Sequence, residues 1–304
     1  MSPSTSDPQG NQPDRQHVTV AAALRNATER LRGAGISETP ALDAEVLLGS
    51  VTGMSRAQLR AYSERLLTAS EAETFGTLLT RRLAHEPAAY LTGHREFMGL
   101  DFLVDARVLV PRPETELLVE DALREIRTRL DRGSEPVVAD IGTGSGAIAV
   151  SIAALERRLH HLYATDISAD ALALARENAE RLGVAKQITF LTGDLLDPIP
   201  APLDIVLANL PYVARHTRAD LPRDVSIYEP AIALYGEDDG LGHFRRFFQQ
   251  APNKVRPGAV LMLEFGYDQR QGIESLAVAA FPQCGLRFMT DYSGWDRYVV
   301  IHVP

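Results

Sequence analysis

One stretch of this chain, residues 140–147 with the sequence D-I-G-T-G-S-G-A, constrains its fold more than any other. It follows a short apolar run at residues 137–141 and precedes the apolar segment Ala147–Leu155, whose composition is typical of a buried helix. Three glycines at alternate positions allow the backbone to turn tightly from a strand into a helix and to approach a ligand closely. The stretch therefore predicts a strand, a ligand-binding turn and a helix.

Strands and helices alternate along the rest of this region. We expect Ser168 to cap a helix that runs to about Leu182, and Pro113 to open an earlier helix. Buried strands separated by helices predict an α/β fold with a doubly wound, mostly parallel sheet. The strands expected after the first are residues 162–165, 188–191, 205–208, 259–265 and 298–302.

The chain before this region divides into three parts. Residues 1–16 are rich in Ser, Pro, Gln and Asp and lack a signal-peptide pattern, so we predict a disordered tail. Residues 17–89 show helical periodicity throughout and predict a small all-α domain. Residues 90–112 predict a β-hairpin linker, with strands at 97–99 and 102–104 and a turn at Gly99, which leaves residues 113–304 as the α/β domain.

Composition excludes several classes of protein. The formal net charge of −9 argues against direct binding of nucleic acid through a broad basic surface. The single cysteine, Cys284, excludes an internal disulfide, and the histidines show no metal-ligand spacing, so we expect no metal. No apolar stretch approaches the ~20 residues that span a bilayer. We therefore predict a soluble cytoplasmic protein.

The glycine turn leaves two kinds of cofactor open. Its spacing also fits the dinucleotide pattern G-x-G-x-x-A, and in either case Asp166, at the end of the second strand, would accept hydrogen bonds from ribose hydroxyls. After the third strand, Asp194 could bind an adenine amino group while Leu195 covers the ring. A nicotinamide oxidoreductase would need a proton donor or acceptor beside the hydride acceptor, yet no His or Lys stands at the ends of these strands. We therefore favour an S-adenosylmethionine-dependent methyltransferase, with these cofactor-binding candidates: Gly142, Thr143, Gly144, Ser145, Gly146, Asp166, Asp194, Leu195 and Asn209.

The fourth strand ends in Asn209, Leu210, Pro211 and Tyr212, which we take as the catalytic candidates. The Asn209 side-chain oxygen and the Leu210 backbone carbonyl could each accept one N–H of a planar NH2 group and aim its nitrogen at a methyl donor. Pro211 restricts Leu210 to extended backbone angles, and Tyr212 offers a flat surface to the planar group. Such catalysis consists of positioning and electrostatics and requires no general base.

The chain resembles the protein-(glutamine-N5) methyltransferases that modify peptide chain release factors. Residues 110–116, V-P-R-P-E-T-E, look like the hallmark of this family, and segments such as Tyr228-Glu229-Pro230 support the likeness, which extends from about Val18 onward. The resemblance implies a seven-stranded, Rossmann-like sheet with an N-terminal helical domain that docks the substrate. It also implies the reaction: transfer of methyl from S-adenosylmethionine, which becomes S-adenosylhomocysteine, to the glutamine of the Gly-Gly-Gln motif in class 1 release factors.

Two departures from the family pattern stand out. The family usually has proline where this chain has Leu210, and the form Asn-Leu-Pro-Tyr is similar to the motif of rRNA adenine-N6 dimethyltransferases. An adenine-N6 methyltransferase acting on RNA or DNA is therefore the alternative. The family's usual Gly-Gly is Gly236-Glu237 here. Arg112, within the hallmark, either contacts a ligand or forms a structural salt bridge.

Overall fold

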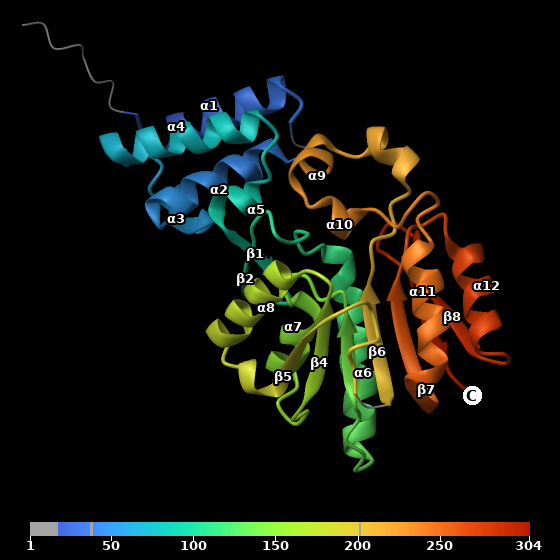
Figure 1. The fold of residues 1–304 in the computed structure, drawn as a ribbon. Helices are drawn as coiled ribbons and strands as arrows, with labels where there is room; N and C mark the ends of the chain where they lie inside the picture. Colours follow the sequence, from blue (N-terminus) through green and yellow to red (C-terminus); the bar gives the residue numbers. More distant parts are fainter. Residues whose placement is uncertain (1–17, 37–38, 201) are drawn as a thin grey trace, which may run out of the picture. The chain divides into compact units, whose positions relative to one another are not determined.

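The computed structural model describes residues 18–36, 39–200 and 202–304, and it divides into two compact units (Figure 1). The first unit ends at Thr92 and the second begins at Gly93. The tail predicted at residues 1–16 lies outside the described residues. None of the described helices is long and apolar enough to cross a membrane.

The first unit is helical, as the sequence predicts. Its apolar core includes Leu31, Leu47 and Phe75, which are almost inaccessible to solvent. Side chains cap three of the helices, and Ser55 and Thr68 each form a capping box that satisfies free backbone N–H groups. The helices are α1 (Val20–Gly33), α2 (Pro40–Thr52), α3 (Arg56–Ala61), α4 (Ala69–Leu83) and α5 (Ala88–Thr92).

The second unit contains a seven-stranded sheet in the order β5-β4-β3-β6-β7-β9-β8. Strands β3 to β7 pair in parallel, whereas β9 runs antiparallel to both of its neighbours. This confirms the predicted mostly parallel, doubly wound sheet. The strands are β3 (Val138–Ile141), β4 (Leu162–Asp166), β5 (Ile188–Thr192), β6 (Leu203–Asn209), β7 (Val255–Glu264), β8 (Gly285–Thr290) and β9 (Asp296–His302).

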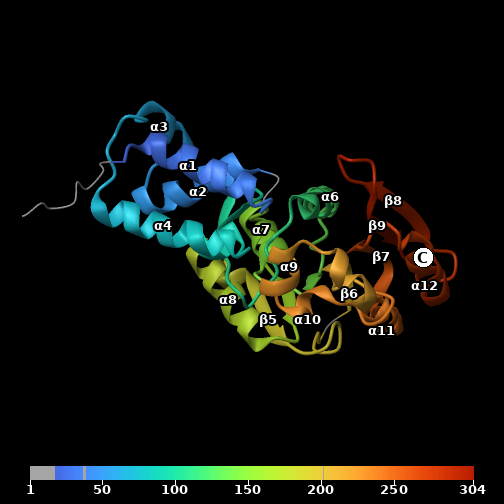
Figure 2. The same cartoon turned by 90° about the horizontal axis from the view of Figure 1, so that it is seen from above.

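Helices cover both faces of this sheet, because alternate strand residues point to opposite sides. Val138 packs into the cluster formed with α6 (Pro113–Asp131), α7 (Ala147–Leu155) and α8 (Ala169–Arg181). Its neighbour Ala139 packs into the cluster on the other face, formed with α11 (Gly242–Gln250) and α12 (Arg270–Ala280). Figure 2 shows α6 and α11 on opposite sides of β6 and β7. The short helices are η1 (Ala185–Gln187), η2 (Arg215–Asp220), α9 (Arg223–Tyr228), α10 (Ala231–Leu234) and η3 (Ala251–Asn253).

A β-hairpin precedes the sheet, with β1 (His94–Phe97) paired to β2 (Leu100–Leu103). The strand bounds predicted at 97–99 and 102–104 are wrong, because the turn takes both Met98 and Gly99, which have φ values of 54° and 74°. Two consecutive residues with positive φ are typical of a tight hairpin turn.

A buried side-chain amide, that of Asn178, helps to tie the hairpin to the rest of the second unit. The Asn178 side chain on α8 accepts a hydrogen bond from Leu103 N at 2.7 Å and donates to Leu103 O at 3.0 Å. The same amide nitrogen donates to Ser145 O in the glycine turn at 2.9 Å. One side chain therefore holds the hairpin, the helix α8 and the glycine turn together.

Candidate active site

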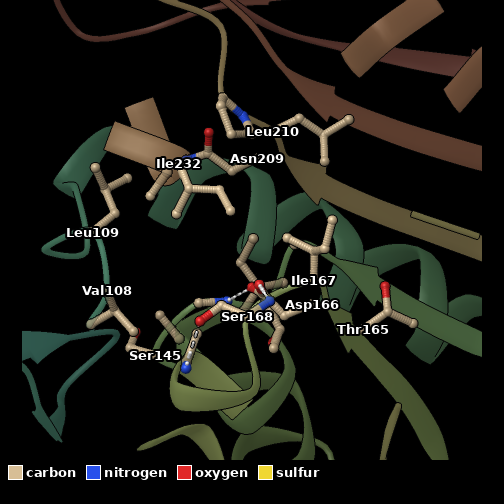
Figure 3. A pocket seen from close by; sticks show the side chains of 18 of the residues that line it. Val108, Leu109, Ser145, Thr165, Asp166, Ile167, Ser168, Asn209, Leu210 and Ile232 are labelled. Carbon is tan, nitrogen blue, oxygen red and sulfur yellow. Dashed lines mark hydrogen bonds between the residues drawn. The ribbon is translucent and has the colours of Figure 1, made fainter. Parts of the chain in front are cut away.

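A cavity of about 240 Å³ opens where β3, β4, β5 and β6 end, and all of its lining residues belong to the second unit. Strand order reverses between β3 and β6, because the chain runs outward from β3 to β5 and then returns to the other side of β3. Open α/β sheets bind ligands at such a point. In Figure 3, Asn209, Leu210 and Ile232 lie on one side of this cavity and Asp166 and Ser168 on the other.

The glycine turn forms one wall of the cavity. Gly142, Gly144 and Gly146 have φ values of 72°, 56° and 81°, a backbone region that side chains disfavour. The N–H groups of Gly142 and Thr143 both donate to Thr165 O, at 2.8 and 2.9 Å, which fastens the turn to the end of β4. The positive φ values at these three positions explain why the sequence carries glycine at alternate positions here.

Asp140, the first residue of the motif, holds the glycine turn through side-chain hydrogen bonds. Its Oδ2 accepts hydrogen bonds from Thr143 Oγ1 at 2.6 Å and from Ala149 N at 3.1 Å, while its Oδ1 has no hydrogen-bond partner among the described residues. Burial raises the pKa of this carboxyl group to about 7. Asp140, which is 1% exposed, thus links the glycine turn to the first residues of α7.

Asp166 lines the cavity at the end of β4, as the sequence predicts for this position. Its Oδ2 accepts a hydrogen bond from Gly144 N and its Oδ1 accepts one from Ser168 N, each at 2.9 Å (Figure 3). Burial raises the pKa of this carboxyl group. The two backbone N–H groups hold the carboxylate against the glycine turn, and each oxygen retains capacity for a further donor.

Asp194 and Leu195 lie at the end of β5 and also line the cavity. Leu195 has a φ of 51°, and its carbonyl accepts a hydrogen bond from Thr165 Oγ1 at 2.9 Å. Asp194 Oδ1 lies 3.6 Å from Arg246 Nη1 on α11, and Arg246 Nη2 lies 2.6 Å from His243 Nδ1. Nothing in the local sequence indicates Arg246 or His243, because α11 does not directly follow the carboxyl end of any described strand.

Asn209 lies at the end of β6, and two buried side chains hold its amide. Asn209 Nδ2 donates to Thr115 Oγ1 at 3.1 Å, and Thr115 Oγ1 donates to Glu264 Oε2 at 2.6 Å. Glu264 ends β7, and burial raises its pKa to about 7. Sequence reasoning missed Thr115 and Glu264 as site residues, although Glu264 follows the strand-end rule that located Asp166 and Asn209.

The other three catalytic candidates occupy different surroundings. Leu210 is 2% exposed, and its side chain lines the cavity together with Pro211. Tyr212 is not among the cavity-lining residues; its carbonyl accepts a hydrogen bond from Gln269 Nε2 at 2.9 Å. Burial raises the pKa of the Tyr212 phenol, as does the neighbouring carboxylate of Glu264. The structure therefore brings Asn209, Leu210 and Pro211 together at the cavity and leaves the Tyr212 side chain outside its lining.

The hallmark segment at residues 110–116 connects the site to three other elements. Arg112 Nη2 lies 2.8 Å from both carboxylate oxygens of Glu229, so this arginine forms the salt bridge that the sequence left open. Glu116 Oε1 accepts a hydrogen bond from Met98 N at 2.8 Å. Together with the bond from Thr115 to Glu264, these contacts attach the start of α6 to β7, to the hairpin and to the loop after β6.

The loop after β6 contains Gly236 and Glu237, where the chain departs from the family pattern. Glu237 has a φ of 70°, in the left-handed region that favours glycine. A glycine at this position would relieve the backbone strain, whereas this chain carries a glutamate side chain there.

Comparison with known families matches both units. The family model described as PrmC N-terminal domain matches residues 22–93, and the model described as Methyltransferase small domain matches residues 115–225. Among solved structures, the hMettl16 catalytic domain in complex with MAT2A 3'UTR hairpin 6 is 16% identical, with a TM-score of 0.51 over 79% of this chain and 84% of that chain. This likeness shows the methyltransferase fold alone. Within the described ranges, no group of three or more His, Cys, Asp or Glu side chains is placed to hold a metal ion.

Relatives match over nearly the whole chain. The release factor glutamine methyltransferase of Moorella thermoacetica is 44% identical over 92% of this chain and 97% of its own length. The enzyme of the same name from Bordetella pertussis is 42% identical over 85% of this chain and 93% of its own length. That of Chlorobaculum tepidum is 38% identical over 86% of this chain and 89% of its own length. With these relatives and the cavity described above, the chain belongs to the family of release factor glutamine methyltransferases.

Proposed function

We propose that this enzyme transfers a methyl group from S-adenosylmethionine to the side-chain amide nitrogen of the glutamine in the Gly-Gly-Gln motif of class 1 peptide chain release factors. The observation that carries the proposal is the orientation of Asn209. Its NH2 group is engaged by Thr115, which leaves Oδ1 as the atom that can accept an N–H inside the cavity. The release-factor names of the relatives favour a protein glutamine over the alternative, an adenine base.

The cavity fits the proposed cofactor. Four residues of the glycine turn line the cavity: Gly142, Thr143, Gly144 and Ser145. The fifth candidate there, Gly146, is the N-cap of α7 and is not among the lining residues. The remaining cofactor-binding candidates, Asp166, Asp194, Leu195 and Asn209, line the same cavity. Asp166 would contact the ribose, and Asp194 and Leu195 would contact the adenine. When bound, S-adenosylmethionine supplies an electrophilic methyl group on a sulfonium ion.

The reacting amide presents a specific chemical problem that Asn209 and Leu210 address. Its nitrogen lone pair is delocalised into the carbonyl, so the nitrogen is a poor nucleophile. Asn209 Oδ1 and the Leu210 carbonyl would each accept one N–H and thereby fix the direction of attack. No general base is required, because the proton leaves once the nitrogen carries the new methyl group and has become acidic. The stacking role expected of Tyr212 stays a prediction.

The helical unit ending at Thr92 is the part of the chain that we assign to docking of the release factor. It carries a core of its own, centred on residues such as Leu47 and Phe75, and none of its described residues lines the cavity. A large protein substrate requires contact surface beyond the few residues around its reactive glutamine.

The test incubates the enzyme with S-adenosylmethionine and an unmodified class 1 release factor and maps the peptides by mass spectrometry. We expect one added methyl group on the glutamine of the Gly-Gly-Gln peptide. In the Asn209→Ala variant this product should be lost, while binding of S-adenosylhomocysteine, measured by calorimetry, is retained. A well-folded enzyme that leaves the peptide unmodified but methylates an adenine-containing oligonucleotide would overturn the proposal.

A further inference from the structure

Asn209 can present either of two chemically opposite groups to the cavity. Its amide oxygen accepts hydrogen bonds, whereas its NH2 group only donates them. A substrate NH2 group needs an acceptor, so an Asn209 side chain rotated by 180° about its last bond would repel the substrate. The two orientations have almost the same shape, and packing alone does not distinguish them.

We propose that Thr115 and Glu264 are positioning residues that set the orientation of the Asn209 amide and so keep its oxygen directed at the substrate. This inference rests on the proposed function for the identity of the substrate. It adds to that function a control on the catalytic group, exerted by two residues to which the sequence assigned no contact with cofactor or substrate. Of the two, Thr115 lines the cavity.

The direction of the hydrogen bonds follows from which groups can donate. An ionised carboxylate only accepts, so Thr115 must direct its single hydroxyl proton to Glu264, at 2.6 Å. The Thr115 oxygen can then only accept from its other neighbour, 3.1 Å away, and that neighbour must be the NH2 group of Asn209. The Asn209 NH2 group also donates a hydrogen bond to the Glu264 carboxylate itself. The negative charge on Glu264 therefore fixes the donors and acceptors as far as the cavity, both through Thr115 and directly.

Burial makes this control effective. Thr115 is 3% exposed and Glu264 is 2% exposed, so bulk water does not compete for these hydrogen bonds. The two residues lie on α6 and at the end of β7, and Asn209 ends the strand next to β7. Because all three positions belong to regular elements, the geometry is held by the packing of the fold rather than by a loop.

Protonation of Glu264 removes the constraint. A carboxylic acid can donate to Thr115 Oγ1, which frees the hydroxyl proton of Thr115 to bond to Asn209 Oδ1 in the rotated orientation. The charged groups that face Glu264 are Arg297 on β9, which favours its ionised form, and Glu114 on α6, which disfavours it. The neutral phenol of Tyr212 also adjoins it.

The proposal is tested by measuring the steady-state kinetics of three variants with a release factor as substrate. Thr115→Val keeps the shape of the side chain and removes the hydroxyl, and we expect kcat to fall by about tenfold to a hundredfold, with the affinity for S-adenosylhomocysteine unchanged. Thr115→Ser keeps the hydroxyl and should recover most of kcat. The control is Ser151→Ala, which removes a fully buried hydroxyl on α7 that has no hydrogen-bond partner among the described residues. It should leave kcat unchanged.

Glu264→Gln supplies the pH test. In the wild-type enzyme we expect kcat to fall with a single ionisation as pH decreases through about 7. Glutamine cannot ionise, so the variant should have a lower kcat at pH 8 and should lose this acid limb. An acid limb that persists unchanged in Glu264→Gln, or a kcat for Thr115→Val equal to that of wild type, would overturn the proposal.

A spectroscopic measurement separates this proposal from the proposed function. The chain has five asparagines, so selective 15N labelling gives few side-chain NH2 signals, and the Asn209 signal is assigned by its loss in Asn209→Ser. We expect this signal to shift with pH around 7 in the wild-type chain with S-adenosylhomocysteine bound, and to be insensitive to pH in Glu264→Gln. No release factor is present, so an insensitive wild-type signal refutes the positioning role, whereas absent methylation refutes only the proposed function.

Discussion

Glu264 should make the second unit less stable as pH rises, and Glu264→Gln should remove this effect. Burial raises the pKa of this carboxyl group from 4.5 to about 7 in the folded chain. A raised pKa means that the folded state binds more protons than the unfolded state between these values. The stability that this group contributes is therefore greatest below pH 4.5 and is lost as pH rises towards 7. Ionisation of Glu264, which orients Asn209, thus costs folding free energy.

The magnitude follows from the two pKa values. Each unit corresponds to about 1.36 kcal/mol, so over the range from pH 5 to pH 8 the wild-type chain should lose roughly 2–3 kcal/mol through this one group. Asp140, whose pKa burial also raises to about 7, is present in both proteins, so its contribution cancels in the difference between them. The variant should therefore gain stability over wild type by that amount when pH is raised from 5 to 8.

The assay is urea denaturation followed by tryptophan fluorescence. The only tryptophan, Trp295, belongs to the second unit and packs against Tyr267, so its signal reports unfolding of the unit that contains Glu264. The free energy of unfolding is extrapolated for both proteins at pH 5 and at pH 8. A difference between the proteins that is the same at both pH values would refute the reasoning, because it would mean that Glu264 does not change ionisation in this range.

Substitutions at three further positions test other parts of the structure. Asn178→Ala removes the hydrogen bonds to Leu103 and Ser145 and should lower the unfolding free energy by about 2–4 kcal/mol in the same urea assay. It should also weaken S-adenosylhomocysteine binding, measured by calorimetry. Unchanged stability would contradict the role of Asn178 in holding these elements together. The Glu237→Gly variant should be more stable than the Glu237→Ala variant by about 1 kcal/mol of unfolding free energy, because φ at this position is 70°. Equal stability of the two variants would argue against backbone strain at this position. Gly146→Ala should weaken S-adenosylhomocysteine binding at least tenfold, since φ is 81° at the start of α7; unaltered affinity would count against the rigid turn.

Much of the fold was predictable because its signals are local. The helix Ala147–Leu155 has the bounds that the sequence predicted, and Ser168 caps α8 as expected, with Ala171 N donating to its hydroxyl. Strand β8 was missed, because it lies at the edge of the sheet and none of its residues is fully buried. An edge strand lacks the continuous apolar run that identified the central strands.

The site was predictable where it follows the ends of strands, and not where it depends on contacts across the chain. Asp166 and Asn209 occupy the predicted places at the cavity. The contact between Thr115 and Glu264 joins residues 149 positions apart, and nothing in either local sequence indicates the other. The expected stacking surface at Tyr212 depends on a side-chain direction, which a tetrapeptide motif does not specify.

The three bonds made by Asn178 also bear on how enzymes of this kind could be recombined. They make the hairpin, α8 and the glycine turn a single piece of architecture, whereas the peptide bond between Thr92 and Gly93 separates the two compact units. A chimera that exchanges the helical unit for that of a relative should therefore be joined at this bond, with the hairpin inherited from the methyltransferase parent. A junction placed after the hairpin would make the hydrogen bonds of Asn178 depend on the backbone of another protein's hairpin. Any displacement of that backbone would move the Asn178 side chain and, through it, the glycine turn.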